Sequence, residues 1–96
     1  MPTYVALYNW TEQGIKNVKE TTKRYDAAVP FAEKMGVRVI QFLYTMGGYD
    51  IVAIFEAKDE ESMNAFSLAL ASMGNVKSTT MRAYKVDEMA KILSKV

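Results

Sequence analysis

The spacing of apolar residues along the chain alternates between two patterns. Dense runs of apolar and β-branched residues are typical of strands, whereas apolar residues at steps of three and four are typical of amphipathic helices. The dense runs predict four strands, at residues 3–9, 37–46, 49–57 and 76–86. A helical pattern follows the first strand and the third strand, and a short helix is expected at the C-terminus.

The first helix is expected to begin after Thr11, whose hydroxyl can cap it. Pro30 lies inside the helical pattern and predicts a kink or a split there, and Thr21–Thr22 is a second weak point. Gly36 is the predicted stop. The expected buried stripe of this helix consists of Ile15, Val18, Thr22, Tyr25, Val29 and Ala32.

The later helices have their own start and stop signals. Asp59 is a predicted N-cap for the second helix and Gly74 its stop, and Asp87 is predicted to cap a terminal helix that ends at Val96. The buried stripe of the second helix is expected to be Met63, Phe66, Leu70 and Met73.

The resulting order, βαββαβ with an added C-terminal helix, is the ferredoxin-like α+β pattern. We therefore predict one domain over residues 1–96, with a four-stranded antiparallel sheet in the order 4-1-3-2 and both main helices on one face. Gly47–Gly48 predicts the hairpin turn between the second and third strands. Strands one and three are the most apolar, which fits central positions, and the polar fourth strand fits an edge.

Alternate residues of a strand point to opposite faces of the sheet, so each strand divides into two sets. We assign to the helix-covered face Val5, Leu7, Ile51, Ala53, Phe55, Met81 and Ala83. The remaining face then carries Tyr4, Ala6, Tyr8, Val52, Ile54 and Tyr84.

That second face is too apolar to lie in water. We expect another copy of the chain to cover it, sheet against sheet, in a homodimer or a higher oligomer. The alternative is that the covered face also encloses a cavity for a small apolar or aromatic ligand.

The amino-acid composition limits the kinds of partner and reaction that the chain could serve. The 96 residues are 50% hydrophobic and carry 12 Lys and Arg against 11 Asp and Glu, which gives no support for a nucleic-acid binder. The chain has no cysteine and no histidine, so thiolate nucleophiles, Cys-ligated zinc and histidine bases are excluded. No phosphate loop, nucleophile elbow or carboxylate cluster with metal spacing is found, and we expect no cofactor.

The N-terminal sequence Met-Pro-Thr-Tyr has no basic region followed by an apolar run, so no signal peptide is expected. No stretch reaches the roughly 18 apolar residues of a membrane span. We expect a cytoplasmic protein without a membrane partner.

Three segments resemble the GYD domain family, in the order in which that family has them. They are Asn9–Ile15, Thr45–Ala57 with Gly48-Tyr49-Asp50 at its centre, and Leu70–Ala83. The sequence departs from the family at Thr21–Thr22, where relatives often have proline, and at Pro30, where many have a charged residue. The motif residues that carry over are Gly48, Tyr49, Asp50, Gly74, Asn75, Thr79, Thr80 and Arg82.

The resemblance implies a ferredoxin-like domain related to the dimeric α+β-barrel proteins, in which two subunits pack sheet against sheet. Relatives in that wider group include small monooxygenases, isomerases and ligand-sensing modules. The GYD family itself has no settled biochemical function, so the resemblance implies architecture more than chemistry.

Candidate ligand-binding residues come from the aromatic and polar positions near the motifs. Asp50 is either a turn carboxylate that accepts backbone N–H groups or a buried acid paired with Arg82 on the open face. Trp10 and Asn75 are first of all corner and helix-stop residues. The cluster Lys16, Lys19, Lys23 and Arg24 is interpreted as a solvated helix face. The candidate site is Tyr8, Trp10, Tyr49, Asp50, Asn75, Thr80 and Arg82, and no catalytic or metal-binding residue is assigned.

Two functional hypotheses remain. The first is a homo-oligomeric module that binds a small ligand or another protein without catalysis. The second is a cofactor-independent enzyme, of the oxygenase or isomerase kind, that acts on a small apolar or aromatic metabolite. We favour the first because the sequence offers no histidine base, metal set or activated nucleophile.

Overall fold

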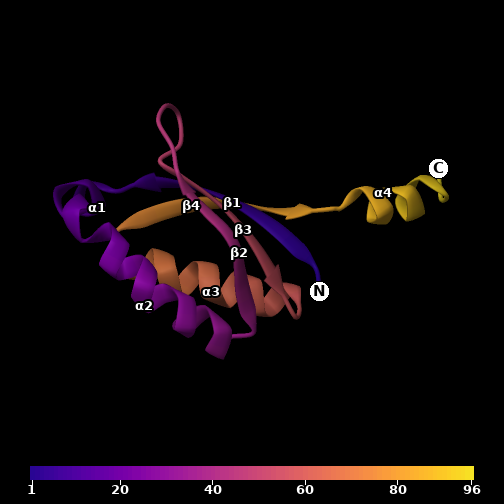
Figure 1. The fold of residues 1–96 in the computed structure, drawn as a ribbon, viewed down its shortest axis with the longest axis horizontal. Coiled ribbons are helices and arrows are strands. Elements are labelled where there is room, and N and C mark those ends of the chain that lie inside the picture. The colour runs from indigo at the N-terminus through magenta and orange to yellow at the C-terminus, as the bar shows by residue number, and fades with distance from the viewer.

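A computed structural model describes residues 1–96 and confirms the βαββαβ order with a C-terminal helix (Figure 1). The sheet is antiparallel throughout, in the order β2-β3-β1-β4, which is the predicted order read from the other edge. The elements are β1 (Thr3–Trp10), α1 (Glu12–Lys16), a 3₁₀ turn η1 (Val18–Glu20), α2 (Thr21–Lys34), β2 (Val37–Tyr44), β3 (Ile51–Ala57), α3 (Glu60–Ser72), β4 (Val76–Ala83) and α4 (Val86–Leu93).

The core lies between the sheet and the helices α2 and α3, which cover one face of it (Figure 1). Phe55 of β3 and Phe66 of α3 pack edge to face, with ring centroids 5.6 Å apart. Met63 and Ala32 add to this layer and are fully buried. Apolar burial of this kind is the main favourable contribution to folding.

The register of β1 corrects the predicted division into faces. Tyr4 pairs with Phe55, and Ala6 pairs with Ala53, so Tyr4, Ala6 and Tyr8 lie on the helix-covered face together with the predicted residues of β3. Val5 and Leu7 lie on the open face instead. A one-residue change of phase moves every side chain of a strand to the other side.

The same correction applies to β4, because Val5 pairs with Met81 and Tyr4 pairs with Arg82. Met81 and Ala83, predicted to face the helices, therefore lie on the open face. Arg82, predicted to lie on the open face, occupies a strand position that points to the helix-covered face. The prediction for Val52 and Ile54 is confirmed, since both lie opposite open-face residues of β1.

The first helix is interrupted, but not at Pro30. The chain leaves the α-helix at Asn17, passes through η1, and begins α2 at Thr21. The amide of Asn17 donates to the carbonyl of Gln13 (3.1 Å), and such local bonds compete with a continuing helix. As a result the predicted stripe is only partly correct: Ala32 is buried, whereas Ile15 is 51% exposed.

Two predicted caps are confirmed and one is wrong. The Thr11 hydroxyl accepts a hydrogen bond from the N–H of Gly14 (3.0 Å), and the Asp59 carboxylate accepts one from the N–H of Ser62 (2.7 Å). Asp87 lies inside the first turn of α4, which is instead closed by Glu88, whose carboxylate accepts the N–H of Lys85 (2.9 Å).

The strand ends and the hairpin differ slightly from prediction. β2 ends at Tyr44, β3 begins at Ile51, and β4 ends at Ala83, so a longer loop containing Gly47 at φ 107° connects β2 and β3. β2 also carries a bulge at Ile40, where the pairing passes from Val39 to Gln41. An extra residue of this kind interrupts the ladder and bends the strand.

Helix α4 projects beyond the end of the sheet, away from α2 and α3 (Figure 1). Its side chains Met89 and Leu93 are 43% and 56% exposed, and Val86 before them is 89% exposed. An amphipathic helix in this position has an apolar side that nothing in the same chain covers.

Candidate functional site

The sheet face opposite α2 and α3 is apolar at its centre and charged at one end. We call it the open face. Glu56 lies at the charged end, 3.8 Å from Arg38 and 3.3 Å from Lys85. Its apolar residues, from β2, β3, β1 and β4, are Ile40, Leu43, Val52, Ile54, Val5, Leu7 and Met81.

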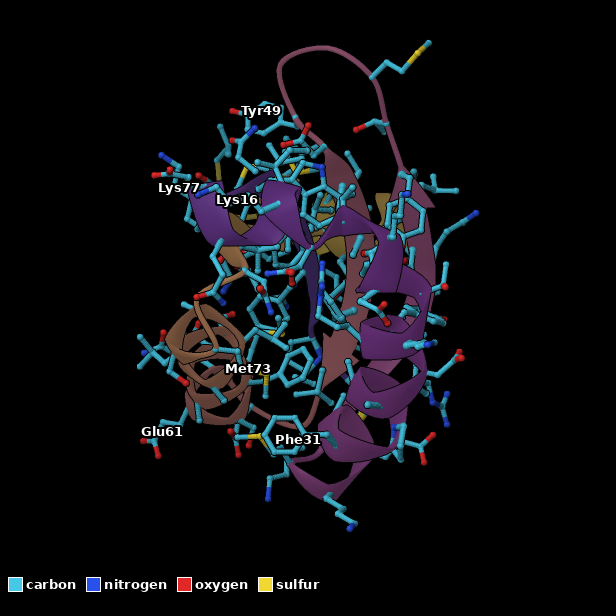
Figure 2. The ribbon with its side chains drawn as sticks, turned by 90° about the vertical axis from the view of Figure 1, so that its left-hand side faces the viewer. Lys16, Phe31, Tyr49, Glu61, Met73 and Lys77 are labelled. Atoms are coloured by element: carbon cyan, nitrogen blue, oxygen red, sulfur yellow. The ribbon has the colours of Figure 1, made fainter.

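The other side of the sheet contains a cavity of about 200 Å³ between α2, α3 and the central strands. We call it the helix-side cavity. In Figure 2 the labelled side chains Phe31 of α2 and Met73 at the end of α3 mark its two helical walls. Its lining is mostly apolar and aromatic: Tyr8, Trp10, Thr21, Arg24, Tyr25, Ala27, Ala28, Phe31, Phe42, Ile51, Leu70, Met73, Asn75 and Val76.

Aromatic rings form one wall of this cavity. Tyr25 and Phe42 have ring centroids 4.7 Å apart, and Phe42 meets Tyr44 edge to face at 5.4 Å. Trp10 stacks on Tyr44 at 6.4 Å. Of these rings, Trp10, Tyr25 and Phe42 line the cavity directly, and aromatic pairs in such arrangements add to the energy of packing.

Two polar groups of the cavity lining have no hydrogen-bond partner. The Tyr8 side chain is only 3% exposed, and its hydroxyl is buried without a partner. Burial raises the pKa of the Tyr8 phenol well above its usual value, so the hydroxyl stays protonated. One terminal nitrogen of Arg24, Nη2, is buried and unpartnered as well, while Nη1 donates to the carbonyl of Asn17 (2.9 Å).

The structure divides the predicted site residues among three places. Tyr8, Trp10 and Asn75 line the helix-side cavity. Tyr49 is 42% exposed in the loop between β2 and β3, where its carbonyl accepts the Thr45 hydroxyl (2.6 Å). Thr80 and Arg82 line a second, more polar groove between α3 and β4, whose other residues include Tyr4 and Glu60.

Asp50 is an acceptor for backbone groups. Its carboxylate accepts the N–H of Trp10 (2.8 Å), and its own N–H donates to the carbonyl of Tyr8 (2.8 Å). It therefore holds the start of β3 against the end of β1. This is the turn-carboxylate alternative raised from the sequence.

Arg82 has a different charged partner. Its guanidinium lies 3.7 Å from the Glu88 carboxylate of α4, donates to the carbonyl of Thr3 (3.2 Å), and covers the Tyr84 ring at 4.5 Å. Asp50 bonds to residues at the Tyr8 end of β1, whereas Arg82 pairs with Tyr4. Four residues of strand span about 13 Å, so the predicted Asp50–Arg82 pair is not formed.

The motif residues at the corner between β1 and α1 hold two distant segments together. The N–H of Thr11 donates to the carbonyl of Asn75 (3.1 Å). The Gln13 amide donates to the Asn75 side chain (2.9 Å) and to the carbonyl of Met73 (3.0 Å). Asn75 thus lines the cavity, while its polar atoms form the hydrogen bonds that hold the corner between β1 and α1.

Sequence reasoning missed Arg24, Tyr25, Phe31 and Phe42 as cavity residues. Arg24 was interpreted as part of a solvated basic cluster, because the stripe was counted from Ile15 through an unbroken helix. Counted from Thr21, the positions facing the sheet include Ala28 and Ala32. Arg24 precedes Ala28 by one helical turn and shares its side, which is the signal that could have found it.

Other kinds of site receive no support from the side chains. No group of three or more His, Cys, Asp or Glu residues lies close enough together to hold a metal ion. None of the helices combines the length and the apolar character needed to cross a membrane.

Comparison with known proteins identifies the family. The GYD domain profile matches residues 4–93. A protein of Thermus thermophilus named "Glutamine synthetase and cystathionine beta-lyase binding protein" is 32% identical over 90 residues, which are 93% of this chain and 95% of that protein. No solved structure matches this chain significantly. The segments singled out in the sequence lie within the matched range, and the chain belongs to the GYD domain family.

Proposed function

We propose that this protein is a non-catalytic binding module that works as a homo-oligomer and docks on other proteins. The observation that carries the proposal is the open face. Val52, Ile54 and Leu7 form the centre of an apolar surface that no helix of the chain covers. Burial of such a surface against another protein is favourable.

A second copy of the chain is the occupant we propose for the open face. A domain of 96 residues buries a smaller fraction of its surface than a larger one, and pairing two identical faces is the commonest form of oligomer. The ion pairs of Glu56 form a polar edge at one end of the apolar centre, as polar residues do at the rim of an interface.

The relative suggests what the assembled module does. That protein is named for binding glutamine synthetase and cystathionine beta-lyase, and it is similar to this chain over nearly the whole length of both. We therefore propose a metabolic enzyme as the protein partner here, with glutamine synthetase as the first to test.

Sedimentation equilibrium of the wild type and of Ile54→Lys at micromolar concentration tests self-association. The wild type is expected to sediment as a dimer or a larger assembly. The variant is expected to be monomeric, because it places an unpaired charge inside the interface. Thr22→Lys adds the same charge to an exposed position of α2 and should leave the assembly intact. A monomeric wild type would contradict the proposal.

Binding to glutamine synthetase of the same organism is measured separately, with the enzyme immobilised and the wild-type protein in solution. Saturable binding supports the adaptor role. An absence of binding by an assembled wild type would reject this partner while leaving self-association in place.

A further inference from the structure

The helix-side cavity combines an apolar interior with two polar groups that have no use within the fold. Native structures rarely leave buried polar atoms unpaired. Four side-chain atoms of this chain are buried without a partner: Oγ1 of Thr3, the hydroxyls of Tyr4 and Tyr8, and Nη2 of Arg24. Of these residues, Tyr8 and Arg24 line the helix-side cavity. Two unsatisfied groups around one cavity indicate a ligand that would satisfy both.

The charge of Arg24 defines that ligand more closely. The chain forms five ion pairs, and none of them includes Arg24. The guanidinium donates to the carbonyl of Asn17 through Nη1 only. A carboxylate is the group that a guanidinium binds best, through short charge-assisted hydrogen bonds.

Tyr8 offers a compatible donor. Its hydroxyl is a protonated O–H group, and a neutral phenol can donate to the same carboxylate that a guanidinium holds. Tyr8 pairs with Ile51 at the end of the two central strands, and this pairing fixes the position of the residue that carries the phenol. Arg24 belongs to the first turn of α2 and lines the same cavity.

The rest of the lining selects an apolar body. Tyr25, Phe31, Phe42 and Leu70 present ring faces and methyl groups, with which an aromatic ligand packs well. A cavity of about 150 Å³ accommodates benzene. A cavity of about 200 Å³ is therefore larger than a benzene ring needs and leaves room for a short substituent.

We propose that the helix-side cavity binds a small aromatic carboxylic acid, with its ring between α2 and α3 and its carboxylate on Arg24 and Tyr8. The site lies on the other side of the sheet from the open face. Ligand binding therefore does not depend on self-association, and an experiment can reject either proposal without rejecting the other.

The direct test is calorimetric titration of the wild-type protein with phenylacetate and with phenylacetamide. The two molecules share the ring and differ in charge. Hydrogen bonds to charged groups contribute enough to make the acid bind at least about tenfold more tightly than the amide. Equal affinities, or no heat of binding with either, would overturn the proposal.

Variants locate the site. Arg24→Gln should weaken phenylacetate binding about tenfold or more, and Tyr8→Phe should weaken it by a smaller factor of about three to ten. Lys23→Gln removes the same charge from the adjacent residue, whose side chain is 80% exposed and lies 3.3 Å from Glu20. It should bind phenylacetate as the wild type does.

A third variant tests the cavity without removing a polar group. Ala28 lines the cavity, and Ala28→Leu should occupy the space of the ring and abolish binding. Circular dichroism of each variant verifies that it is folded, since the Arg24 bond to Asn17 also spans the break before α2. Normal affinity in folded Arg24→Gln or Ala28→Leu would place the ligand elsewhere and reject the site.

Discussion

At the scale of single residues, the corner between β1 and α1 leaves no room for a side chain at Gly14. Gly14 lies against the backbone of Asn75, and a Cβ atom added to Gly14 would lie 1.9 Å from the Asn75 carbonyl oxygen. No side chain fits there. The corner and the loop after α3 must therefore stay in contact through their backbones.

Replacing Gly14 by alanine is expected to destabilise the protein by about 1–3 kcal/mol or more. The added methyl group would push α1 away from Asn75 and break the Thr11 hydrogen bonds to that loop. Urea denaturation measures the change in the free energy of unfolding.

Gly48→Ala is the matched control, because nothing lies within 4 Å of a Cβ atom at Gly48. It should change stability by no more than about 0.5 kcal/mol. Equal stability of Gly14→Ala and the wild type would show that the corner can open at little cost.

Tyr8 predicts a response to alkaline pH. Burial raises the pKa of its phenol in the folded protein above the usual value of 10, whereas in the unfolded chain the pKa returns to about 10. The contribution of this phenol to the free energy of unfolding is therefore fully present below pH 10 and is lost as the pH rises further. The free energy of unfolding should fall by up to about 1.4 kcal/mol per pH unit.

Chemical denaturation between pH 8 and 11.5 measures this loss. Tyr8→Phe should show a shallower decline above pH 10 than the wild type. Tyr4, whose pKa is raised in the same direction by burial, remains in the variant, so part of the decline should persist. Parallel curves for the two proteins would contradict the assignment to Tyr8.

At the scale of elements, the sequence predicts some strand faces and not others. In β3, the polar residues Asp50 and Glu56 share a phase, so the apolar residues Ile51, Ala53 and Phe55 are assigned correctly to the core. The run TYVALYN of β1 contains apolar or aromatic residues in both phases. Alternation therefore carries no information there, and the large Tyr4 and Tyr8 rings fill the space under the helices.

The candidate site shows the same limit. Tyr8, Trp10 and Asn75 were selected from the sequence, but for the wrong face or for the corner alone. The side of the helix on which Arg24 lies could not be predicted while the break at Asn17 was unknown. The four residues between α1 and α2 change the direction in which every later side chain of the helix points. The turn role of Asp50 could be predicted, since it needs only a carboxylate next to a tight turn.

Helix α4 is too short to be stable by itself. Isolated helices below about 12 residues are marginal in water, and α4 has eight. Within the chain it is held by the Arg82–Glu88 ion pair and by the Glu88 cap of Lys85. Its apolar side chains Met89 and Leu93 remain exposed in the single chain.

Removing residues 86–96 tests whether α4 belongs to the subunit interface. If α4 packs on a second copy, the truncated chain should dissociate about tenfold or more readily, because the burial of Met89 and Leu93 is lost. Sedimentation equilibrium measures the dissociation constant. The truncated chain should still fold, since α4 contributes no residue to the core. Unchanged association would assign α4 another role.

At the scale of the whole molecule, the sheet separates two surfaces with different properties. The helix-covered side encloses a small cavity with a guanidinium and a phenol in its walls. The open face is wide and apolar, with charges at one end. A single antiparallel sheet of four strands can therefore support a ligand and a subunit contact that do not compete for the same residues.

The bulge in β2 has a consequence for how many copies can assemble. A sheet edge that pairs with another edge can propagate into a filament, because each added strand exposes a new edge. The extra residue at Ile40 interrupts this edge of the sheet, and charged Arg38 lies beside it. Growth at that edge is disfavoured. The contact we propose through the open face would bury that face in both molecules, so the assembly would stop at closed pairs instead of forming a polymer.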